Sequence, residues 1–509
     1  MTQESQTAGK VFLVGAGPGD PSLITLRAVD CLRQADAVLY DYLVNPRILE
    51  HVRPTAECIC LGQHGRTRLW TQDEINSKLI ELARQGKTIV RLKGGDPAVF
   101  ARGAEEGKAL ADEGILFELV PGITTALAAA SYTGVAVTHR ELSSAVALVT
   151  GQEHGKKDES SLDYEALARF PGTLVIYMGV TSADHWTRRL LEAGKDPETP
   201  VVIVRRCSTP NQETIHCRLD EVAGTMALGG LRPPAVVIIG VVADLPGTLS
   251  WFESRPLFGQ RVMVTRPVSQ AQSLVKQLSE LGAEVICQPA IEICPPQDWE
   301  AVDAILKDLS RFNWLVFSSS NGVRFLLNRL LEIGGDMRDL GGIRLAAIGP
   351  GTAEAIQQYH LTVDLQPTEY RAEALAEALG PKVSDQSVLL ARASRGREVL
   401  AERLSEAGAT VEQVVVYQSQ DVSTVADAIM ERLVAGDVDW VTVTSSAIAR
   451  SLRALLGDHL ATVRLASISP ITSEVLRELG MKPTVEAASY TMKGIVDAIV
   501  QGSNAGKSG

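Results

Sequence analysis

A glycine-rich loop and a nearby carboxylate are the residues in the first half whose types and spacing most suggest chemistry. Gly15-Ala-Gly-Pro-Gly-Asp20 follows the apolar run 11–14 and precedes a helix predicted to open at Ser22, while Asp41 ends the next apolar run. This order is typical of a dinucleotide-binding turn. However, the third glycine falls one position early, Pro18 removes an amide donor, and Asp20 places an anion where a pyrophosphate would lie. The loop predicts a ligand without phosphates, with a ligand-free turn and a dinucleotide-dependent dehydrogenase as alternatives.

Three further turns rich in small residues follow apolar runs in the same half, at residues 93–97, 121–125 and 177–179. In an open α/β sheet, loops at the carboxyl ends of strands line the ligand crevice, so we expect these loops to converge. Small residues let backbone N–H and C=O groups approach a ligand closely. Such a crevice suits adenosine and an amino-acid moiety.

In the second half, hydroxyl-rich turns stand out, and nothing resembles a nucleophile–base pair, a metal cluster or a phosphate loop. These turns lie at 317–322, 349–352, 444–446 and 469–472. At helix N-termini they form anion sites, because free amides and hydroxyls face the ligand. Ordinary helix N-caps are the alternative. The candidate substrate contacts are Ser319, Thr352, Ser445 and Thr472.

The elements that must position these residues form an α/β pattern. Short β-branched runs alternate with amphipathic stretches almost from end to end. A chain of 509 residues exceeds the roughly 250–300 residues of one core, so two or more domains are expected. Prolines and glycines interrupt the pattern at 244–259. We predict domains at 10–245 and 259–503, a linker at 246–258, and disordered tails at 1–9 and 504–509.

The second half contains an internal duplication. Segments beginning at Arg261 and Asn313 recur 126 residues later, and a segment beginning at Leu345 recurs 120 residues later. Units of this length are too long for a solenoid repeat. They predict two similar α/β lobes with a cleft between them.

Composition excludes several classes of protein. The formal charge is −12 and neither half is basic, which argues against a nucleic-acid track. No apolar run reaches the roughly 18 residues of a membrane span, and the N-terminus lacks a signal-peptide core, so a soluble cytoplasmic protein is expected. The seven cysteines include no C-x-x-C pair, which predicts buried reduced thiols and no metal site.

Six motifs in the first half resemble uroporphyrinogen-III C-methyltransferase in order and spacing, across about residues 10–252. They are VGAGPGDP, VLYD, RLKGGDPAVFARG, VPGITTA, GVAVTHR and YMG. The resemblance implies a tetrapyrrole methylase fold, with two α/β subdomains and S-adenosyl-L-methionine between them, in a homodimer formed through this domain. It further implies methylation of uroporphyrinogen III at C2 and C7, which gives precorrin-2.

The resemblance also assigns residues. It implies that Asp41 is the proton acceptor, although a strand-end carboxylate that only forms hydrogen bonds is the alternative. Cys207 stands where the family commonly has glycine, and a backbone contact would survive that change. The positions that match cofactor contacts are Pro18, Gly94, Gly95, Asp96, Val99, Thr124, Thr125, Met178 and Cys207.

One position departs from the family pattern. Gln63 replaces a lysine that is a proposed proton donor, and glutamine cannot donate a proton and be regenerated. The implied substrate carries eight carboxylates, which an acidic protein can bind only through a local basic patch. We expect that patch at His64, Arg66 and Arg68. Weaker candidates are Arg91, Lys93, Arg102, His139 and Arg140.

The second half resembles uroporphyrinogen-III synthase across about 259–503, through VTRP, VFSSSNGV, AIGPGTAEAI, VVVYQS, VTSSAI and SYTMKGIVDAI. The resemblance implies cyclisation of hydroxymethylbilane with inversion of ring D and without a cofactor. Tyr417 matches a tyrosine proposed to assist loss of the hydroxyl, and a half-buried strand aromatic is the alternative. Arg266 is a candidate carboxylate contact at the cleft.

Together the two resemblances predict a bifunctional enzyme, because the second half would make the substrate of the first. A non-catalytic, two-lobed binding module in the second half is the alternative. Both predicted domains account for the chain without an oxidase and ferrochelatase module, so precorrin-2 is the expected end product.

Overall fold

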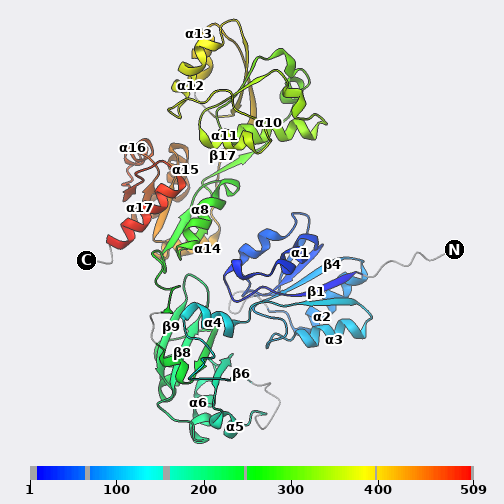
Figure 1. Cartoon of the computed structure of the whole chain (residues 1–509), viewed down its shortest axis with the longest axis vertical. Coiled ribbons are helices and arrows are strands. Elements are labelled where there is room, and N and C mark those ends of the chain that lie inside the picture. The colour runs from blue at the N-terminus through cyan, green and yellow to red at the C-terminus, as the bar shows by residue number, and fades with distance from the viewer. Residues whose placement is uncertain (1–8, 63–68, 153–160, 246–248, 396–397, 506–509) are drawn as a thin grey trace, which may run out of the picture. The chain divides into compact units, whose positions relative to one another are not determined.

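The computed structural model describes residues 9–62, 69–152, 161–245, 249–395 and 398–505 (Figure 1). The chain separates into two compact units. The first comprises Met1–Gln260 with Ser279–Glu284, and the second comprises Arg261–Leu278 with Val285–Gly509.

The first unit begins with a parallel five-stranded sheet in the order β3-β2-β4-β1-β5. Its central strands are nearly continuous apolar runs, as expected for strands that are buried on both faces. The strands are β1 (Lys10–Gly15), β2 (Ala37–Tyr40), β3 (Glu57–Cys60), β4 (Thr88–Lys93) and β5 (Leu116–Val120). The helices of this part are α1 (Leu26–Gln34), α2 (Gln72–Arg84), α3 (Gly103–Asp112) and α4 (Thr125–Thr133).

A second, mixed sheet completes this unit in the order β6-β7-β10-β8-β9, with β10 antiparallel to both of its neighbours. The strands are β6 (Val146–Thr150), β7 (Thr173–Tyr177), β8 (Pro200–Arg205), β9 (Glu213–Arg218) and β10 (Ala235–Ile239). The helices are α5 (Tyr164–Arg169), α6 (Ala183–Glu192) and α7 (Val222–Leu228). The predicted pair of α/β subdomains is therefore present.

The prediction that a helix opens at Ser22 is wrong. A single 3-10 turn occupies Pro21–Leu23, and α1 begins only at Leu26. Thr25 has an extended backbone and its side chain accepts a hydrogen bond from the Ala28 amide, so it is the N-cap of α1.

The second unit contains two lobes, each built on a five-stranded sheet. The first lobe has the order β12-β11-β18-β19-β20. Its strands are β11 (Arg261–Val264), β12 (Glu284–Cys287), β18 (Trp440–Val443), β19 (Arg464–Ser467) and β20 (Val485–Glu486). Its helices are α8 (Val268–Glu280), α14 (Asp427–Val434), α15 (Ser446–Leu456), α16 (Pro470–Glu478) and α17 (Met492–Ala505).

The second lobe has the order β13-β17-β16-β14-β15 and is parallel except for the β13–β17 pair. Its strands are β13 (Ile291–Cys294), β14 (Trp314–Phe317), β15 (Arg344–Ala347), β16 (Ser387–Ala393) and β17 (Thr410–Asp421). Its helices are α9 (Glu300–Leu306), α10 (Ser320–Glu332), α11 (Pro350–Gln357), α12 (Ala372–Leu379) and α13 (Val399–Glu406).

The two similar lobes confirm the predicted fold class, but they do not coincide with the two copies of the sequence repeat. By the repeat, β11 matches β16, β18 matches β14, and β19 matches β15. Matched strands occupy the same place in different sheets, and each sheet takes strands from both copies. Each copy therefore exchanges part of its structure with the other.

Residues 249–258 pack onto α4 of the first unit. The Trp251 Nε1–H donates to the Ser131 carbonyl at 2.8 Å, and the Phe252 and Tyr132 rings lie 4.6 Å apart. Phe252 and Leu257 are fully buried. This part of the segment predicted as a linker thus contributes to a core.

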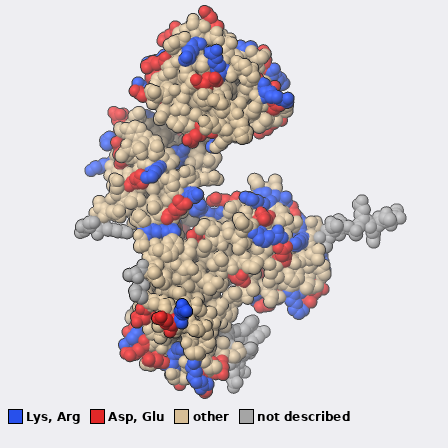
Figure 2. Space-filling view, in the orientation of Figure 1, with Lys and Arg blue, Asp and Glu red and all other residues tan. Residues whose placement is uncertain are grey.

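The prediction that the cysteines are buried is wrong for Cys58, Cys60 and Cys287, which are exposed. Cys58 and Cys60 lie on β3, an edge strand whose side chains largely face solvent. None of the seven cysteines forms a disulfide. No helix in the described part of the chain is long and apolar enough to cross a membrane. Figure 2 shows both signs of charge scattered over the visible face, with no continuous basic track.

Candidate active sites

Three glycine-containing loops meet at the carboxyl edge of the first sheet. Gly17 and Gly95 exchange two backbone hydrogen bonds, of 3.2 and 2.7 Å. A Cβ added to Gly15 would lie 2.6 Å from the Gly122 Cα. Side chains cannot occupy this crossing, so the expected convergence of the loops is present and depends on glycine.

Two aspartates shape these loops by accepting hydrogen bonds. Asp96 accepts from the Ala98 amide at 2.7 Å and from the Gly122 amide at 3.0 Å. Asp20 caps the 3-10 turn and also accepts from the Tyr132 hydroxyl at 2.8 Å. Because Asp20 is an acceptor at the place where a pyrophosphate would need donors, the geometry disfavours the dinucleotide alternative.

The second sheet contacts these loops through Tyr177 at the end of β7. The Tyr177 hydroxyl lies 2.7 Å from the Thr124 hydroxyl and accepts from the Ala126 amide at 2.8 Å. The Tyr177 and Phe100 ring centroids are 5.1 Å apart. Met178 follows Tyr177 and is 46% exposed. Aromatic, thioether and hydroxyl groups thus surround the glycine loops, and the sequence analysis had not assigned a role to Tyr177 or Phe100.

The predicted cofactor contacts lie in or beside these loops. Gly94, Gly95, Asp96 and Thr124 belong to the linked loops, and Pro18, Val99 and Thr125 are half-buried beside them. Strained backbone gathers here as well. Several described non-glycine residues have positive φ. Phe100, Arg102 and Met178 lie in these loops, and Arg206 and Ser208 lie in the turn after β8.

Cys207 lies between two of these strained residues. Its side chain is 3% exposed within an apolar cluster, and burial raises the pKa of its thiol to about 12. The adjacent Ser208 hydroxyl accepts from the Asp20 amide at 3.1 Å. The cysteine side chain has found room in the core, so only its main chain can face a ligand.

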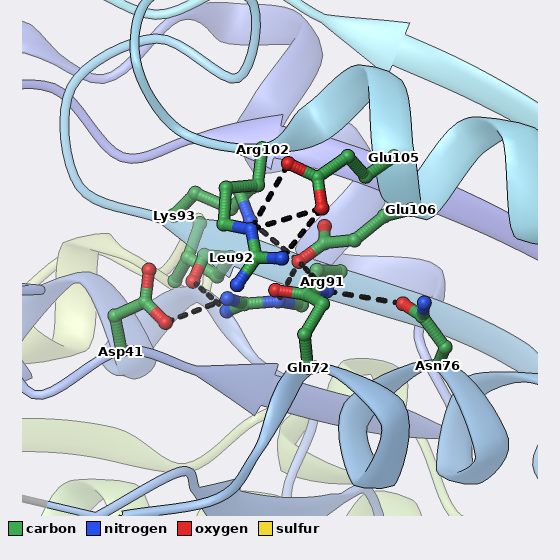
Figure 3. A network of polar contacts seen from close by, with 9 residues as sticks. All are labelled: Asp41, Gln72, Asn76, Arg91, Leu92, Lys93, Arg102, Glu105 and Glu106. Atoms are coloured by element: carbon green, nitrogen blue, oxygen red, sulfur yellow. Dashed lines mark hydrogen bonds and ion pairs between the residues drawn. The ribbon is translucent and has the colours of Figure 1, made fainter. Parts of the chain in front are cut away.

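A chain of alternating charges runs from Asp41 into the protein interior (Figure 3). The Arg91 guanidinium donates to Asp41 at 2.6 Å and to Glu106 at 3.3 Å. The Lys93 ammonium donates to the same Glu106 oxygen at 2.6 Å. Asp41, at the end of β2, is about one-third exposed and is the member of this chain that can meet a substrate.

Burial and pairing decide what the other members can do. Glu106 is fully buried, and its Oε2 has no hydrogen-bond partner among the described residues. Arg91 and Lys93 are each 3% exposed. Burial, and next the nearby positive charge of Arg91, lower the pKa of Lys93. Neither cation can serve as a free contact for a substrate carboxylate, which corrects the expectation for both.

The other members of the predicted basic patch have different outcomes. Gln63, His64, Arg66 and Arg68 lie outside the described residues. Arg102 pairs with Glu105 in a surface contact of 2.5 Å. His139 and Arg140 are not fully buried, and His139 Nδ1 accepts from the Glu141 amide at 3.2 Å.

In the second lobe of the second unit, two predicted residues meet. The Tyr417 hydroxyl, on β17, lies 3.0 Å from the Ser319 hydroxyl, which also caps α10. The Phe325 ring stacks on Tyr417 with centroids 5.7 Å apart. A pocket of about 230 Å³ opens beside this pair. Its polar lining residues are Ser318, Ser319, Arg392, Arg395, Gln413 and Tyr417.

Arg392 and Arg395 were missed by sequence reasoning. The signal that could have found Arg392 is the repeat, since Arg392 lies 126 residues after Arg266.

Thr352 and Thr472 are buried, and the Thr472 hydroxyl lies 3.1 Å from the Ser469 hydroxyl. Ser445 caps α15 in the first lobe.

The fold and these sites define a two-part α/β protein. One part brings backbone, hydroxyl and thioether groups together around the glycine loops, and the other has hydroxyl and arginine groups at the strand ends of two related lobes. Family models bear this out: tetrapyrrole (corrin/porphyrin) methylases match residues 10–223, and uroporphyrinogen-III synthase HemD matches residues 272–497.

Relatives extend the similarity over the whole chain. A porphyrin biosynthesis protein HemD from Ruminiclostridium josui is 31% identical over 496 residues, which are 97% of this chain and 98% of that protein. A uroporphyrinogen-III C-methyltransferase from Bacillus subtilis (strain 168) is 36% identical over 359 residues, covering 70% of this chain and 74% of its own. The chain belongs to the family in which a tetrapyrrole methylase is fused to a uroporphyrinogen-III synthase.

A solved structure resembles the first half. The uroporphyrin-III C-methyl transferase from Thermus thermophilus, complexed with S-adenyl homocysteine, is 42% identical. The match covers 47% of this chain and 100% of the Thermus thermophilus chain, with a TM-score of 0.41.

Proposed function

We propose that the first unit transfers methyl groups from S-adenosyl-L-methionine to C2 and C7 of uroporphyrinogen III, giving precorrin-2. The observation that carries this proposal is the glycine crossing beside Asp41, in a chain that belongs to the methylase–synthase family. The residues present fit the cofactor, because backbone amides, hydroxyls and the Met178 thioether suit an adenosine and an amino-acid group, and Asp20 disfavours a phosphate.

The chain's own groups have two tasks in this reaction. The cofactor, when bound, supplies an electrophilic methyl group. The loops around Gly95 and Gly122 hold the reactants in line, which is the larger source of acceleration. Asp41 then accepts the proton that is lost as conjugation is restored, and Arg91 fixes the position of its carboxylate.

We further propose that the second unit cyclises hydroxymethylbilane to uroporphyrinogen III with inversion of ring D. Tyr417 would donate a hydrogen bond to the departing hydroxyl, and Ser319 holds the Tyr417 hydroxyl in place. Arg266 and Ser445 would contact substrate carboxylates. Thr352 and Thr472 are buried, and their amides already donate to the Gly349 carbonyl at 3.1 Å and to the Ser469 hydroxyl at 3.3 Å, so their substrate contacts stay predictions.

Several parts of the proposal concern the whole protein. The homodimer, the cytoplasmic location and the predicted domain boundaries stay predictions. We expect precorrin-2 to be the end product, and formation of sirohydrochlorin with reduction of NAD by the pure protein would contradict that limit.

An isomer assay on the full chain tests both activities. Hydroxymethylbilane alone should yield uroporphyrinogen III, and addition of S-adenosyl-L-methionine should convert it to a dimethylated product, as measured by mass. Formation of the type I isomer alone would establish the binding-module alternative for the second unit. Tight binding of NAD(P) without binding of S-adenosyl-L-methionine would overturn the methyltransferase proposal.

A further inference from the structure

The duplication in the second unit places one arginine at the same position in each lobe. Arg266 directly follows the end region of β11, and Arg392, which is 126 residues later, lies near the end of the matching strand β16. In each lobe the neighbouring strand leads to a serine-capped helix. Ser445 accepts from the Ile448 amide at 3.2 Å, and Ser319 accepts from the Gly322 amide at 3.0 Å. Both lobes thus carry an arginine beside a helix N-terminus, which is a favourable arrangement for an anion.

The two arginines differ in their partners. Arg392 donates to Glu398 at 2.5 Å and to Gln413 at 2.7 Å. The repeat places Gln272 at the position of Glu398 and Cys287 at the position of Gln413 in the first lobe. Both lobes have therefore kept the arginine, but only the second lobe has a carboxylate, that of Glu398, to pair with it.

Arg266 is accordingly a partly buried cation that no carboxylate neutralises within the described part of the chain. Its Nη2 donates to the Gln270 side-chain oxygen at 2.9 Å, and its buried Nε has no hydrogen-bond partner. Leaving a buried charge uncompensated is costly, and an anionic ligand would remove that cost.

Two more buried polar atoms without partners lie at the same edge of the first lobe. Thr444 follows β18 and is 8% exposed, while Ser473 lies in the first turn of α16 and is fully buried. The hydroxyl oxygens of both have no partner among the described residues. Since β11, β18 and β19 are adjacent in the sheet, these groups and Arg266 come from neighbouring strand ends. The edge that holds Arg266 thus contains polar groups whose hydrogen-bonding capacity the described residues leave unused.

The second lobe has a different specialisation. The repeat places Ile291 in the first copy where the second copy has Tyr417. The hydroxyl proposed to assist the chemistry thus belongs to the lobe whose arginine is already paired.

We propose that the first lobe binds a side-chain carboxylate of the linear tetrapyrrole through Arg266, whereas Arg392 is a positioning residue for the Tyr417 pocket. This division of roles deepens the proposed synthase function and depends on it. Arg266 is then a specificity-determining residue, and Arg392 acts only through its neighbours.

The isosteric change Gln270→Glu tests the proposal in the full chain, because it places a carboxylate on Arg266 without altering shape. We expect it to raise KM for hydroxymethylbilane by about tenfold or more with kcat within about twofold, since a charged hydrogen bond to the substrate is lost. Arg266→Gln should have the same effect. Arg392→Gln should lower kcat more than it raises KM.

Gln277→Glu is the matched control. It adds the same charge to a partly exposed position of the same helix, where the Gln277 side chain donates to the Ser273 carbonyl at 3.3 Å and to the Ser273 hydroxyl at 3.1 Å. It should leave KM unchanged, and chemical denaturation monitored by tryptophan fluorescence verifies that the second unit of each variant is folded. Unchanged KM in Gln270→Glu, or an equal rise in KM for Arg392→Gln and Arg266→Gln, would overturn the division of roles.

Binding of uroporphyrinogen III by anaerobic calorimetry separates this inference from the proposed function. The first unit is identical in wild type and Gln270→Glu, so any difference in affinity between them comes from the second unit. If the wild-type chain yields only the type I isomer, the synthase proposal fails; weaker binding by Gln270→Glu would still support an anion site at Arg266. Equal binding by both chains would refute that site.

Discussion

Glu106 is the residue on which the interior of the methyltransferase site depends. Its carboxylate receives both Arg91 and Lys93 in a region where all three side chains are almost completely buried. Removal of one partner from a buried charge network is costly because the remaining charges lose their compensation.

We therefore expect Glu106→Gln to lower the free energy of unfolding of the first unit by about 3 kcal/mol or more. The neighbouring Glu105 offers a matched control, because it pairs with Arg102 on the surface. Glu105→Gln should stay within about 0.5 kcal/mol of wild type. Chemical denaturation monitored by tryptophan fluorescence measures both, and similar effects of the two variants would contradict the role of the buried network.

Tyr417 is the corresponding residue in the synthase site. Tyr417→Phe keeps the ring that stacks on Phe325 but removes the hydroxyl beside Ser319. If the hydroxyl assists departure of the substrate hydroxyl, kcat for the type III isomer should fall by about 10²-fold with little change in KM. Steady-state kinetics with isomer analysis would show this. Full activity of the variant would leave Tyr417 as a packing residue.

At the scale of elements, the glycine crossing ties three loops of the first unit together. A Cβ at Gly122 would lie 2.3 Å from the Gly95 carbonyl oxygen and 2.8 Å from the Gly15 Cα. These are backbone atoms, which cannot move aside as a flexible side chain could. The loops would have to separate.

Gly122→Ala should accordingly reduce the affinity for S-adenosyl-L-methionine by at least about tenfold, since the loops no longer meet in one geometry. Gly224→Ala is the control, because in the described part of the chain no atom outside the helix's own backbone and the two neighbouring residues lies within 4 Å of the added Cβ in α7. That change should leave binding intact and stabilise the helix by up to about 1 kcal/mol. Calorimetric titration distinguishes the two, and wild-type affinity in Gly122→Ala would show that the crossing is not part of the cofactor site.

A second element-scale feature recurs in both lobes of the second unit. The Asp439 carboxylate accepts from the Arg261 amide at 2.8 Å, and the matching Asn313 side chain accepts from the Ser387 amide at 2.9 Å. Only Asp439 also pairs with an arginine side chain, since Arg261 Nε donates to it at 2.9 Å. The same hydrogen bond between a strand amide and a side chain at the start of the neighbouring strand is thus accepted by a neutral amide group in one lobe and by a charged carboxylate in the other.

This charge predicts a pH dependence. Burial by itself would raise the pKa of Asp439, but hydrogen bonds and charge from Arg261 outweigh it and lower the pKa below its ordinary 3.8. A lowered pKa contributes stability above the unfolded pKa, and that stability is lost as the pH falls through the folded pKa. Asp439→Asn should keep the backbone bond, as Asn313 does, and show a shallower loss of stability below about pH 4. Acid unfolding curves test this, and identical curves for both chains would refute it.

At the scale of the whole molecule, two sites in separate units should fail independently. Asp41→Asn keeps the hydrogen bond to Arg91 but removes proton acceptance, so methyl transfer should fall by about 10²–10⁴-fold. Given hydroxymethylbilane and S-adenosyl-L-methionine, this variant should accumulate uroporphyrinogen III. Tyr417→Phe should instead lose synthase activity and keep methyl transfer. Added uroporphyrinogen III should therefore restore its methylated product.

Chromatography with mass detection identifies the products that accumulate in each of the two variants. Affinity for S-adenosyl-L-methionine should barely change in Asp41→Asn. Loss of that affinity would instead assign Asp41 to ribose binding. Loss of synthase activity in Asp41→Asn would contradict independent sites.

Local sequence determined the α/β class and the positions of the loops, because apolar periodicity and glycine spacing act over a few residues, and the internal duplication determined the two similar lobes. Asp41, the glycine turns and the hydroxyl turns could be recognised in this way. The start of α1 could not be recognised in this way. Ser22 and Thr25 are both residue types that cap helices, and only the backbone conformation at Thr25 shows which of them does so.

Only the tertiary structure decided how distant residues pair. Arg91 and Lys93 are cations in the sequence, but Glu106, supplied by another element, makes them interior partners and not substrate contacts. The exchange of strands between the two repeat copies likewise comes from contacts between segments far apart in the chain. Burial and charge compensation depend on everything that surrounds a side chain, and a single sequence specifies those surroundings only through the fold.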